Sequence, residues 1–245
     1  MLKGIRTSAS GMIPKARKQE MIANNIANVA TPGYKKDRMF TKELSRATLK
    51  QLKKTTQSDW QKPMVDKLYT DFAPGSFDNT GNPLDLAIDG DGFFQLQDSE
   101  GNVFLTRSGS FQVDSEGYIS FPGGYRLIGE GGPIQVGNGQ VTVGADGEIS
   151  VDGVVTDQVR AVDVADQSTL EKLGSSLFGV PQGQELLPAL RAEFQQGYLE
   201  AANVDIVHEM VDMIVTYREY EANARALTTQ DQSLDSLFRR VAGNE

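Results

Sequence analysis

Apolar and small residues recur at steps of three and four near both ends of the chain. In the first stretch they are Leu2, Ile5, Ala9, Met12, Ala16, Ala23, Ile26 and Val29. In the last forty residues they are Val204, Val207, Val211, Ile214, Tyr217, Tyr220, Ala224, Leu227, Leu234, Phe238 and Val241. Both stripes are narrow, like the seam of a coiled coil. The pattern predicts two long terminal helices that pair as a coiled-coil-like hairpin.

Local signals place the ends of these helices. Thr31-Pro32-Gly33 is typical of a helix end, because the residue before proline avoids the α region and glycine permits a turn. Pro14 predicts a break or kink near residues 11–14, with 14–31 as the firmer segment. Asn203 is a favourable N-cap for a C-terminal helix that runs to about Arg240.

The middle of the chain alternates apolar and polar residues, as β-strands do. The expected strands are Phe93–Gln97, Val103–Thr106, Phe111–Val113, Tyr118–Ser120, Gln140–Val143 and Glu148–Val151. Asp-Gly pairs at 146–147 and 152–153 are strong hairpin signals. We therefore expect an antiparallel β-rich body over residues 84–199, with loop, a short helix and one strand in its last part.

These patterns predict an α+β fold in three parts. Residues 1–34 and 200–245 form the terminal helical assembly domain, 35–83 a linker or extended segment, and 84–199 the body. The first part of the linker, residues 35–58, is polar and basic, with weak helical periodicity from Met39 onward. We expect it to order only against neighbouring surfaces.

Charge is distributed unevenly along the chain. Residues 1–54 hold 13 Lys and Arg against three Asp and Glu, whereas the whole chain has a net charge of -9. One interpretation of the basic stretch is a solvated helix face, and another is attraction to the acidic surface of a second subunit. Nucleic-acid binding is disfavoured, because aromatic residues do not alternate with the basic ones and the rest of the chain repels phosphate.

The residue inventory argues against catalysis. The chain has no cysteine, and its only histidine, His208, falls within the C-terminal helical pattern, so no nucleophile and base are paired. Asp89, Asp91 and Glu100 have the spacing of a calcium loop, but Phe94 stands where that loop needs glycine. We expect no enzyme activity, catalytic residue, cofactor or metal. No apolar run is long enough to span a membrane, and no secretory signal peptide begins the chain.

Several motifs resemble those of the flagellar axial proteins, the rod, hook and hook-associated family. They are Thr7–Met12, Ile22–Asn28, Thr31–Lys35, Asp85–Phe94, Thr106–Phe111, Gln196–Glu200 and Asn203-Val204. The motifs occur near both ends and in the middle, so the resemblance covers nearly the whole chain. The short body favours a rod protein over a hook protein. Pro14 and Ala202 depart from the family pattern.

The resemblance implies a structural subunit of the basal-body rod that polymerises and transmits torque from motor to hook. It implies export through the flagellar type III apparatus without a cleaved signal peptide, and a location in the rod that spans the periplasm. Its partners would be further copies and neighbouring rod or hook proteins, in a helical homo- or hetero-polymer, with neither nucleic acid nor direct membrane insertion. The alternative is a soluble ligand-binding β module with helical oligomerisation ends.

The terminal helices supply the candidate assembly interface. Its expected residues are Leu2, Ile5, Met12, Ile22, Asn24, Asn25, Ile26, Asn28, Val207, Val211, Ile214, Tyr217, Leu227, Leu234 and Phe238. The three asparagines have two interpretations. They are surface amides, or they donate hydrogen bonds to neighbouring subunits without burying charge.

Overall fold

The computed structural model describes residues 2–42, 64–137, 139–174, 176–181, 183–189 and 191–242. The chain divides into two compact units. Unit 1 contains the terminal helices and a β-hairpin, and unit 2, which we call the body, contains Asn28–Lys36 and Asp71–Val204. The body therefore takes in residues on both sides of the expected linker, and the part of that linker at 43–63 lies outside the described residues.

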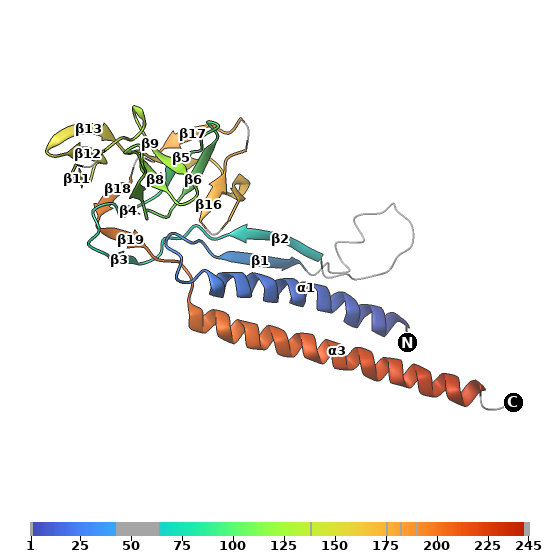
Figure 1. The fold of residues 1–245 in the computed structure, drawn as a ribbon. Coiled ribbons are helices and arrows are strands. Elements are labelled where there is room, and N and C mark those ends of the chain that lie inside the picture. The colour runs from blue at the N-terminus through green and yellow to red at the C-terminus, as the bar shows by residue number, and fades with distance from the viewer. Residues whose placement is uncertain are drawn as a thin grey trace. The chain divides into compact units, whose positions relative to one another are not determined.

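Helices α1 (Leu2–Ala27) and α3 (Ile206–Ala242) pack against each other in unit 1 (Figure 1). They run antiparallel, since Lys15 near the middle of α1 pairs with Glu219 while Asn25 near its end contacts Glu209. The expected packing between the two ends of the chain is confirmed. The finer expectation of a coiled-coil hairpin stays a prediction.

The helix boundaries differ from those expected. Helix α1 is continuous through Pro14, so the predicted break near residues 11–14 is wrong. Pro14 is buried, and we attribute the unbroken helix to packing that outweighs the roughly 3 kcal/mol cost of an interior proline. Asp205, rather than Asn203, caps α3, because its Oδ1 accepts from the backbone N–H groups of Val207 and His208 at 3.0 and 3.1 Å.

Two strands in the expected linker belong to unit 1. Strand β1 (Asp37–Lys42) pairs antiparallel with β2 (Met64–Thr70), and β1 packs on α1 (Figure 1). The helical periodicity inferred from Met39 onward is therefore wrong as far as Lys42. The β-branched and aromatic residues of β2 suit a strand, but pairing with a segment more than twenty residues away has no local signal.

The body is built from short antiparallel strands. Its elements are β3 (Phe77–Asn79), β4 (Leu86–Asp89), β5 (Phe93–Gln97), β6 (Val103–Thr106), β7 (Gln112–Val113), β8 (Ile119–Phe121), β9 (Tyr125–Gly129), β10 (Gly132–Pro133), β11 (Val141–Val143), β12 (Glu148–Val151), β13 (Val154–Gln158), β14 (Ala161–Val164), the 3-10 helix η1 (Gln167–Thr169), β15 (Glu171–Lys172), β16 (Leu177–Gly179), β17 (Leu186–Pro188), β18 (Glu193–Gln196) and β19 (Tyr198–Glu200).

Strand β5 is the centre of the body, because it pairs with β6, β9 and β14 and is buried on both faces. Phe94 and Leu96 point into one apolar cluster with Phe111, Ile119 and Leu127, among others. Phe93 points into a second cluster, where its ring packs edge-on against Phe72. Both faces of the sheet are thus covered.

The last strands of the body return to its first ones. Strand β18 pairs with β4, and β19 pairs with β3. Phe194 of β18 enters the same apolar cluster as Phe94, and their rings lie 6.1 Å apart. This return brings the segment before α3 beside the start of the body.

Candidate assembly site

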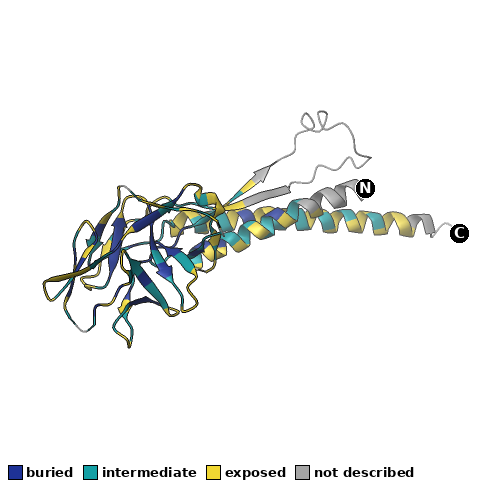
Figure 2. Cartoon of the chain, turned by 90° about the horizontal axis from the view of Figure 1, so that it is seen from above, coloured by how far each residue is buried: buried dark blue, intermediate teal, exposed yellow. Residues whose placement is uncertain are grey.

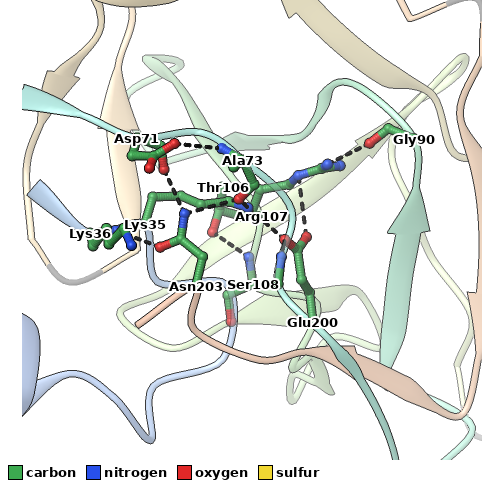
Figure 3. Close-up of polar contacts among 11 residues, drawn as sticks. Lys35, Lys36, Asp71, Ala73, Gly90, Thr106, Arg107, Ser108, Glu200 and Asn203 are labelled. Atoms are coloured by element: carbon green, nitrogen blue, oxygen red, sulfur yellow. Dashed lines mark hydrogen bonds and ion pairs between the residues drawn. The ribbon is translucent and has the colours of Figure 1, made fainter. Parts of the chain in front are cut away.

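Three of the sequence motifs meet at one buried place in the body. Lys35 ends the N-terminal motif Thr31–Lys35, which we call the first motif. Arg107 lies in the central motif Thr106–Phe111, and Glu200 ends the C-terminal motif Gln196–Glu200, which we call the last motif. Figure 3 shows the three side chains converging. We call these three residues the charge cluster. Their side chains are 1%, 5% and 0% exposed, so each charge is almost fully removed from water.

Glu200 is the only anion of the charge cluster and holds both cations. Its Oε1 lies 2.5 Å from Lys35 Nζ and also accepts from the backbone N–H of Gly75 at 2.9 Å. Its Oε2 lies 3.3 Å from Arg107 Nε, an ion pair without hydrogen-bond geometry. Removing one partner of a buried pair leaves an uncompensated charge, which costs about 3–5 kcal/mol.

Burial dominates the electrostatics of both cations. It lowers the pKa of Lys35 below its usual value, and the neighbouring Glu200 only partly offsets this effect. The pKa of Arg107 is likewise lowered by burial, against the attraction of Glu200 and more distant carboxylates. Arg107 Nη2 donates to the carbonyl oxygen of Gly90, while Nη1 finds no partner among the described residues.

Gly33 lets the first motif approach the central one closely. Its φ is +67°, and a Cβ placed on it would lie 2.2 Å from the backbone nitrogen of Ser108. Its N–H donates to the carbonyl oxygen of Glu200 at 2.7 Å. Only glycine combines the left-handed conformation with this contact, so Gly33 is required for the convergence of the three motifs.

Asn203 forms hydrogen bonds to two further segments near the charge cluster. Its Oδ1 accepts from the N–H of Lys36 at 2.8 Å, and its Nδ2 donates to the carbonyls of Asp71 and Ala73. Lys172 adds a bond to the carbonyl of Lys35 at 2.8 Å. Asn203 therefore joins two segments of the body instead of capping α3.

The expected interface residues of α1 fall into three groups. Ile22 and Asn25 are fully buried, Met12 and Ile26 are half-buried, and Asn24 is exposed. Asn28, also half-buried, follows the end of α1 and belongs to the body. The backbones of Leu2 and Ile5 lie in α1, and their side chains lie outside the described part.

Asn25 uses its amide within its own chain. Its Nδ2 donates to the carbonyl of Asp37 at 3.0 Å, and its Oδ1 accepts from the Asp37 N–H at the same distance. Nδ2 also lies 3.4 Å from Glu209 Oε2. Asn25 is therefore not a surface amide, and its bonds join α1 to β1 and α3. Its contact with neighbouring subunits stays a prediction.

Helix α3 carries both exposed and half-buried residues along its length (Figure 2), and the expected residues are found in both classes. Val207, Val211, Ile214, Tyr217 and Phe238 are 53% to 71% exposed. Leu227 and Leu234 are half-buried.

Sequence reasoning missed several exposed apolar residues in unit 1. On α3, Met210 is 49% exposed and extends the row of Val207, Val211, Ile214 and Tyr217. We call these five residues the apolar stripe. The spacing of 207, 210, 211, 214 and 217 is a helical signal that was available in the sequence.

A second exposed set lies on the β1–β2 hairpin, where Phe40 and Leu68 are 66% and 56% exposed. The Phe40 ring lies 5.6 Å from that of Tyr69. These residues had no signal in the sequence because the pairing of the two strands was not foreseen.

The described residues show no arrangement for catalysis. His208 is exposed on α3, and no group of three acidic or histidine side chains there is placed to hold a metal ion. Phe93 and Phe94 occupy the calcium-loop register as core residues of β5. None of the described helices has the length and apolar character needed to cross a membrane.

Comparison with known families gives three matches in chain order. The family model described as "Flagella basal body rod protein" matches residues 5–35. The D1 domain of the flagellar hook protein FlgE/F/G matches 87–151, and the C-terminal model of the flagellar basal body rod FlgEFG proteins matches 195–240. Each match contains one member of the charge cluster.

Full-length relatives agree with these matches. The flagellar basal-body rod protein FlgG of Buchnera aphidicola subsp. Schizaphis graminum is 32% identical over 97% of this chain and 99% of its own length. The chain belongs to the flagellar basal-body rod protein family. FlgG of Bacillus subtilis is 31% identical over 97% of the chain and 98% of its length, and FlgF of Caulobacter vibrioides is 32% identical over 92% of each.

Membership of this family confirms two predictions. The family is one of structural proteins of the flagellum and not one of enzymes, as the residue inventory led us to expect. It also places the chain with the basal body and with neighbouring rod and hook proteins. The identities to FlgG and FlgF are equal at 32%, so they do not distinguish the two.

Proposed function

We propose that the protein is a rod subunit that polymerises through α1 and α3 and transmits torque from the motor to the hook. The observation that carries the proposal is the apolar stripe on α3. Its five side chains lie in water in the single chain, with exposures of 49% to 68%. A row of large apolar residues exposed on one helix face marks a surface that meets another protein.

The apolar stripe is separate from the face of α3 that contacts α1. Tyr217 is 58% exposed, whereas the neighbouring Thr216 is fully buried. Helix α1 adds the exposed Ile13. One helix of the pair thus offers an uncovered apolar face, which is what repeated contact between copies requires.

The body supports this function by being self-sufficient. Its two apolar clusters are enclosed on both faces of β5, and Glu200 pairs with both Lys35 and Arg107 inside the body. A subunit that carries load benefits from a body whose core is enclosed before assembly.

Electron microscopy of the purified protein tests the proposal directly. We expect rods or stacked rings above a threshold concentration, and their loss when Val211 and Ile214 are both changed to Ser. Exchange of Thr228 and Gln232 for Ser, on an exposed part of α3, serves as the control. A discrete dimer that binds a small ligand saturably and never polymerises would favour the ligand-binding alternative, for which no described feature argues.

Export is a separate part of the proposal. We infer that the chain leaves the cytoplasm through the flagellar type III apparatus and keeps its N-terminus, as its family membership suggests. Mass spectrometry of the protein in isolated basal bodies would show an uncleaved first segment, and secretion would stop in a strain without the type III apparatus. A processed N-terminus would contradict this.

Position in the rod is the finer question. The stretch Ile128–Ile134 resembles the proximal rod protein FlgF, which favours that assignment over the distal rod protein FlgG. In the structure this stretch is the end of β9, a turn and β10. Cryo-electron tomography of a tagged subunit distinguishes the two, since FlgF-like density would lie at the inner part of the rod and FlgG-like density at the outer part.

A further inference from the structure

Polar residues recur every seven positions along the face of α3 that is turned to α1. They are Glu209, Thr216, Asn223 and Gln230, which we call the polar row. A second row, also seven apart, lies beside it and is apolar: Met213, Tyr220, Leu227 and Leu234. All eight side chains are buried or half-buried, so both rows belong to the seam between the helices.

Contacts confirm that the polar row faces α1. Glu209 meets Asn25, and a Cβ placed on Gly11 would lie 3.6 Å from Asn223 Nδ2. Ion pairs flank the same seam. Lys15 Nζ lies 2.5 Å from Glu219 Oε2, and farther along α1 Lys18 Nζ lies 3.9 Å from Asp212 Oδ2. A seven-residue repeat facing a partner helix is the geometry of a coiled-coil seam.

The polar row lowers the stability of the pair formed by α1 and α3. Thr216 Oγ1 and Gln230 Oε1 are buried and find no hydrogen-bond partner among the described residues. An unsatisfied buried group costs about 1–3 kcal/mol. The apolar stripe, on another face of α3, meanwhile remains in water. Burial of apolar area accounts for the apolar residues of the seam but not for the polar row, which needs another explanation.

We propose that the polar row determines specificity: it selects α1 of the same chain, in one register, and leaves the apolar stripe for neighbouring subunits. Polar groups in a seam cost stability but penalise shifted registers and apolar partners more. An α3 helix of another copy that brought its apolar stripe against the polar row would bury these groups without partners. The inference rests on the proposed assembly through the terminal helices.

The test fills the polar row with apolar side chains in the full-length protein. The row variant carries Thr216→Val, Asn223→Leu and Gln230→Leu. The control carries Ala222→Leu, Thr229→Val and Gln232→Leu, which introduces the same three side chains at exposed positions of the same helix. Because the chain has no cysteine, pairs of cysteines report the register without interference.

Two cysteine pairs are compared with a short bis-maleimide cross-linker on dilute monomer. Lys15→Cys with Glu219→Cys reports the native register, and Lys15→Cys with Ala226→Cys reports a shift of one heptad, about 10.5 Å along the helix. In the wild type and the control we expect the native pair alone to cross-link. In the row variant we expect the cross-linking yield of the shifted pair to rise from background to a level comparable with that of the native pair.

Association provides the second measurement. We expect the row variant to form small helical oligomers at a concentration about tenfold lower than the control, equivalent to 1.4 kcal/mol. A row variant that keeps the native cross-link alone and associates like the control would overturn the inference. If the wild type never forms rods, the proposed function fails, but the cross-linking result still decides the role of the polar row.

Discussion

At the scale of single residues, the charge cluster explains why three distant motifs occur together. Lys35 and Glu200 are 165 positions apart and lie 2.5 Å from each other in the body. Arg107 completes the set from the central motif. A single fully buried carboxylate holds both cations, so the first, central and last motifs depend on each other through electrostatics as well as through packing.

Glu200→Gln is the sharpest test of the charge cluster. The amide keeps the shape of the side chain but leaves Lys35 and Arg107 buried without an anion, so we expect the free energy of unfolding to fall by about 3–5 kcal/mol. Glu116→Gln is the control, because Glu116 pairs with Arg126 at the surface with 65% of its side chain exposed, and should cost at most about 1 kcal/mol. Urea unfolding of dilute monomer measures both. Equal losses of unfolding free energy in the two variants would show that the charge cluster adds nothing to the stability of the body.

Gly33→Ala tests the close approach of the first motif to Ser108. Gly81 is a matched control, since its φ of +69° equals that of Gly33 within 2° and nothing lies within 4 Å of its Cβ position. Gly81→Ala should therefore show only the backbone strain of about 1–2 kcal/mol. Gly33→Ala adds a steric clash with Ser108 and should lose clearly more stability or fail to fold. Thermal unfolding of the two variants gives the comparison, and a similar loss in both would contradict the clash.

At the scale of elements, α3 presents two different surfaces. The polar row and its apolar neighbours meet α1, while the apolar stripe faces water. Helix α1 contributes Asn25, which contacts Glu209 of α3, and it also buries Pro14 and Ile22. Pairing within the chain and contact between chains thus use separate faces of one helix in the function we propose.

Ile214→Asp separates these two uses. Ile214 is 56% exposed, so the change should alter the stability of the monomer by no more than about 0.5 kcal/mol. In a rod the carboxylate would be buried at a subunit contact, where an unpaired charge costs several kcal/mol. We expect loss of motility in a strain that carries only this variant, with normal circular dichroism of the purified chain. Thr228→Asp, on an exposed part of α3, should assemble normally, and full motility of Ile214→Asp would remove the apolar stripe from the assembly mechanism.

At the scale of the whole molecule, the two units differ in how their cores are built. The body encloses two apolar clusters, whereas unit 1 depends on a seam that contains polar and charged side chains. The ion pair of Lys15 with Glu219 has side chains 34% and 47% exposed, so it contributes at most about 1 kcal/mol. Unit 1 should open more readily than the body.

Limited proteolysis of dilute monomer measures this difference. We expect cleavage within α3 and α1 first, with a resistant fragment that retains Asp71–Val204, because opening of unit 1 exposes little enclosed apolar surface. The assembled form should protect α3 if the apolar stripe is covered by neighbours. First cleavage between residues 86 and 200, or equal resistance of both units, would contradict the expectation. Fragment masses identify the sites.

Much of the architecture follows from local sequence signals. The strands at Phe93–Gln97, Val103–Thr106 and Glu148–Val151 occur where alternation predicted them, and Asp152 and Gly153 adopt positive φ in the hairpin turn that their pair indicated. The terminal helices likewise follow from three- and four-residue spacing. These features depend on neighbours within a few positions, so the sequence alone determines them. The motifs were sufficient to recognise the family.

The remaining features required the tertiary structure. Continuity of α1 through Pro14, pairing of β1 with β2, and the bonding of Asn203 within the body instead of at the start of α3 each depend on contacts between distant segments. The convergence of Lys35 on Glu200 is the extreme case. The sequence marked the apolar positions of α3, but only packing against α1 decided which side is buried, because a helix with several usable faces is oriented by its partner.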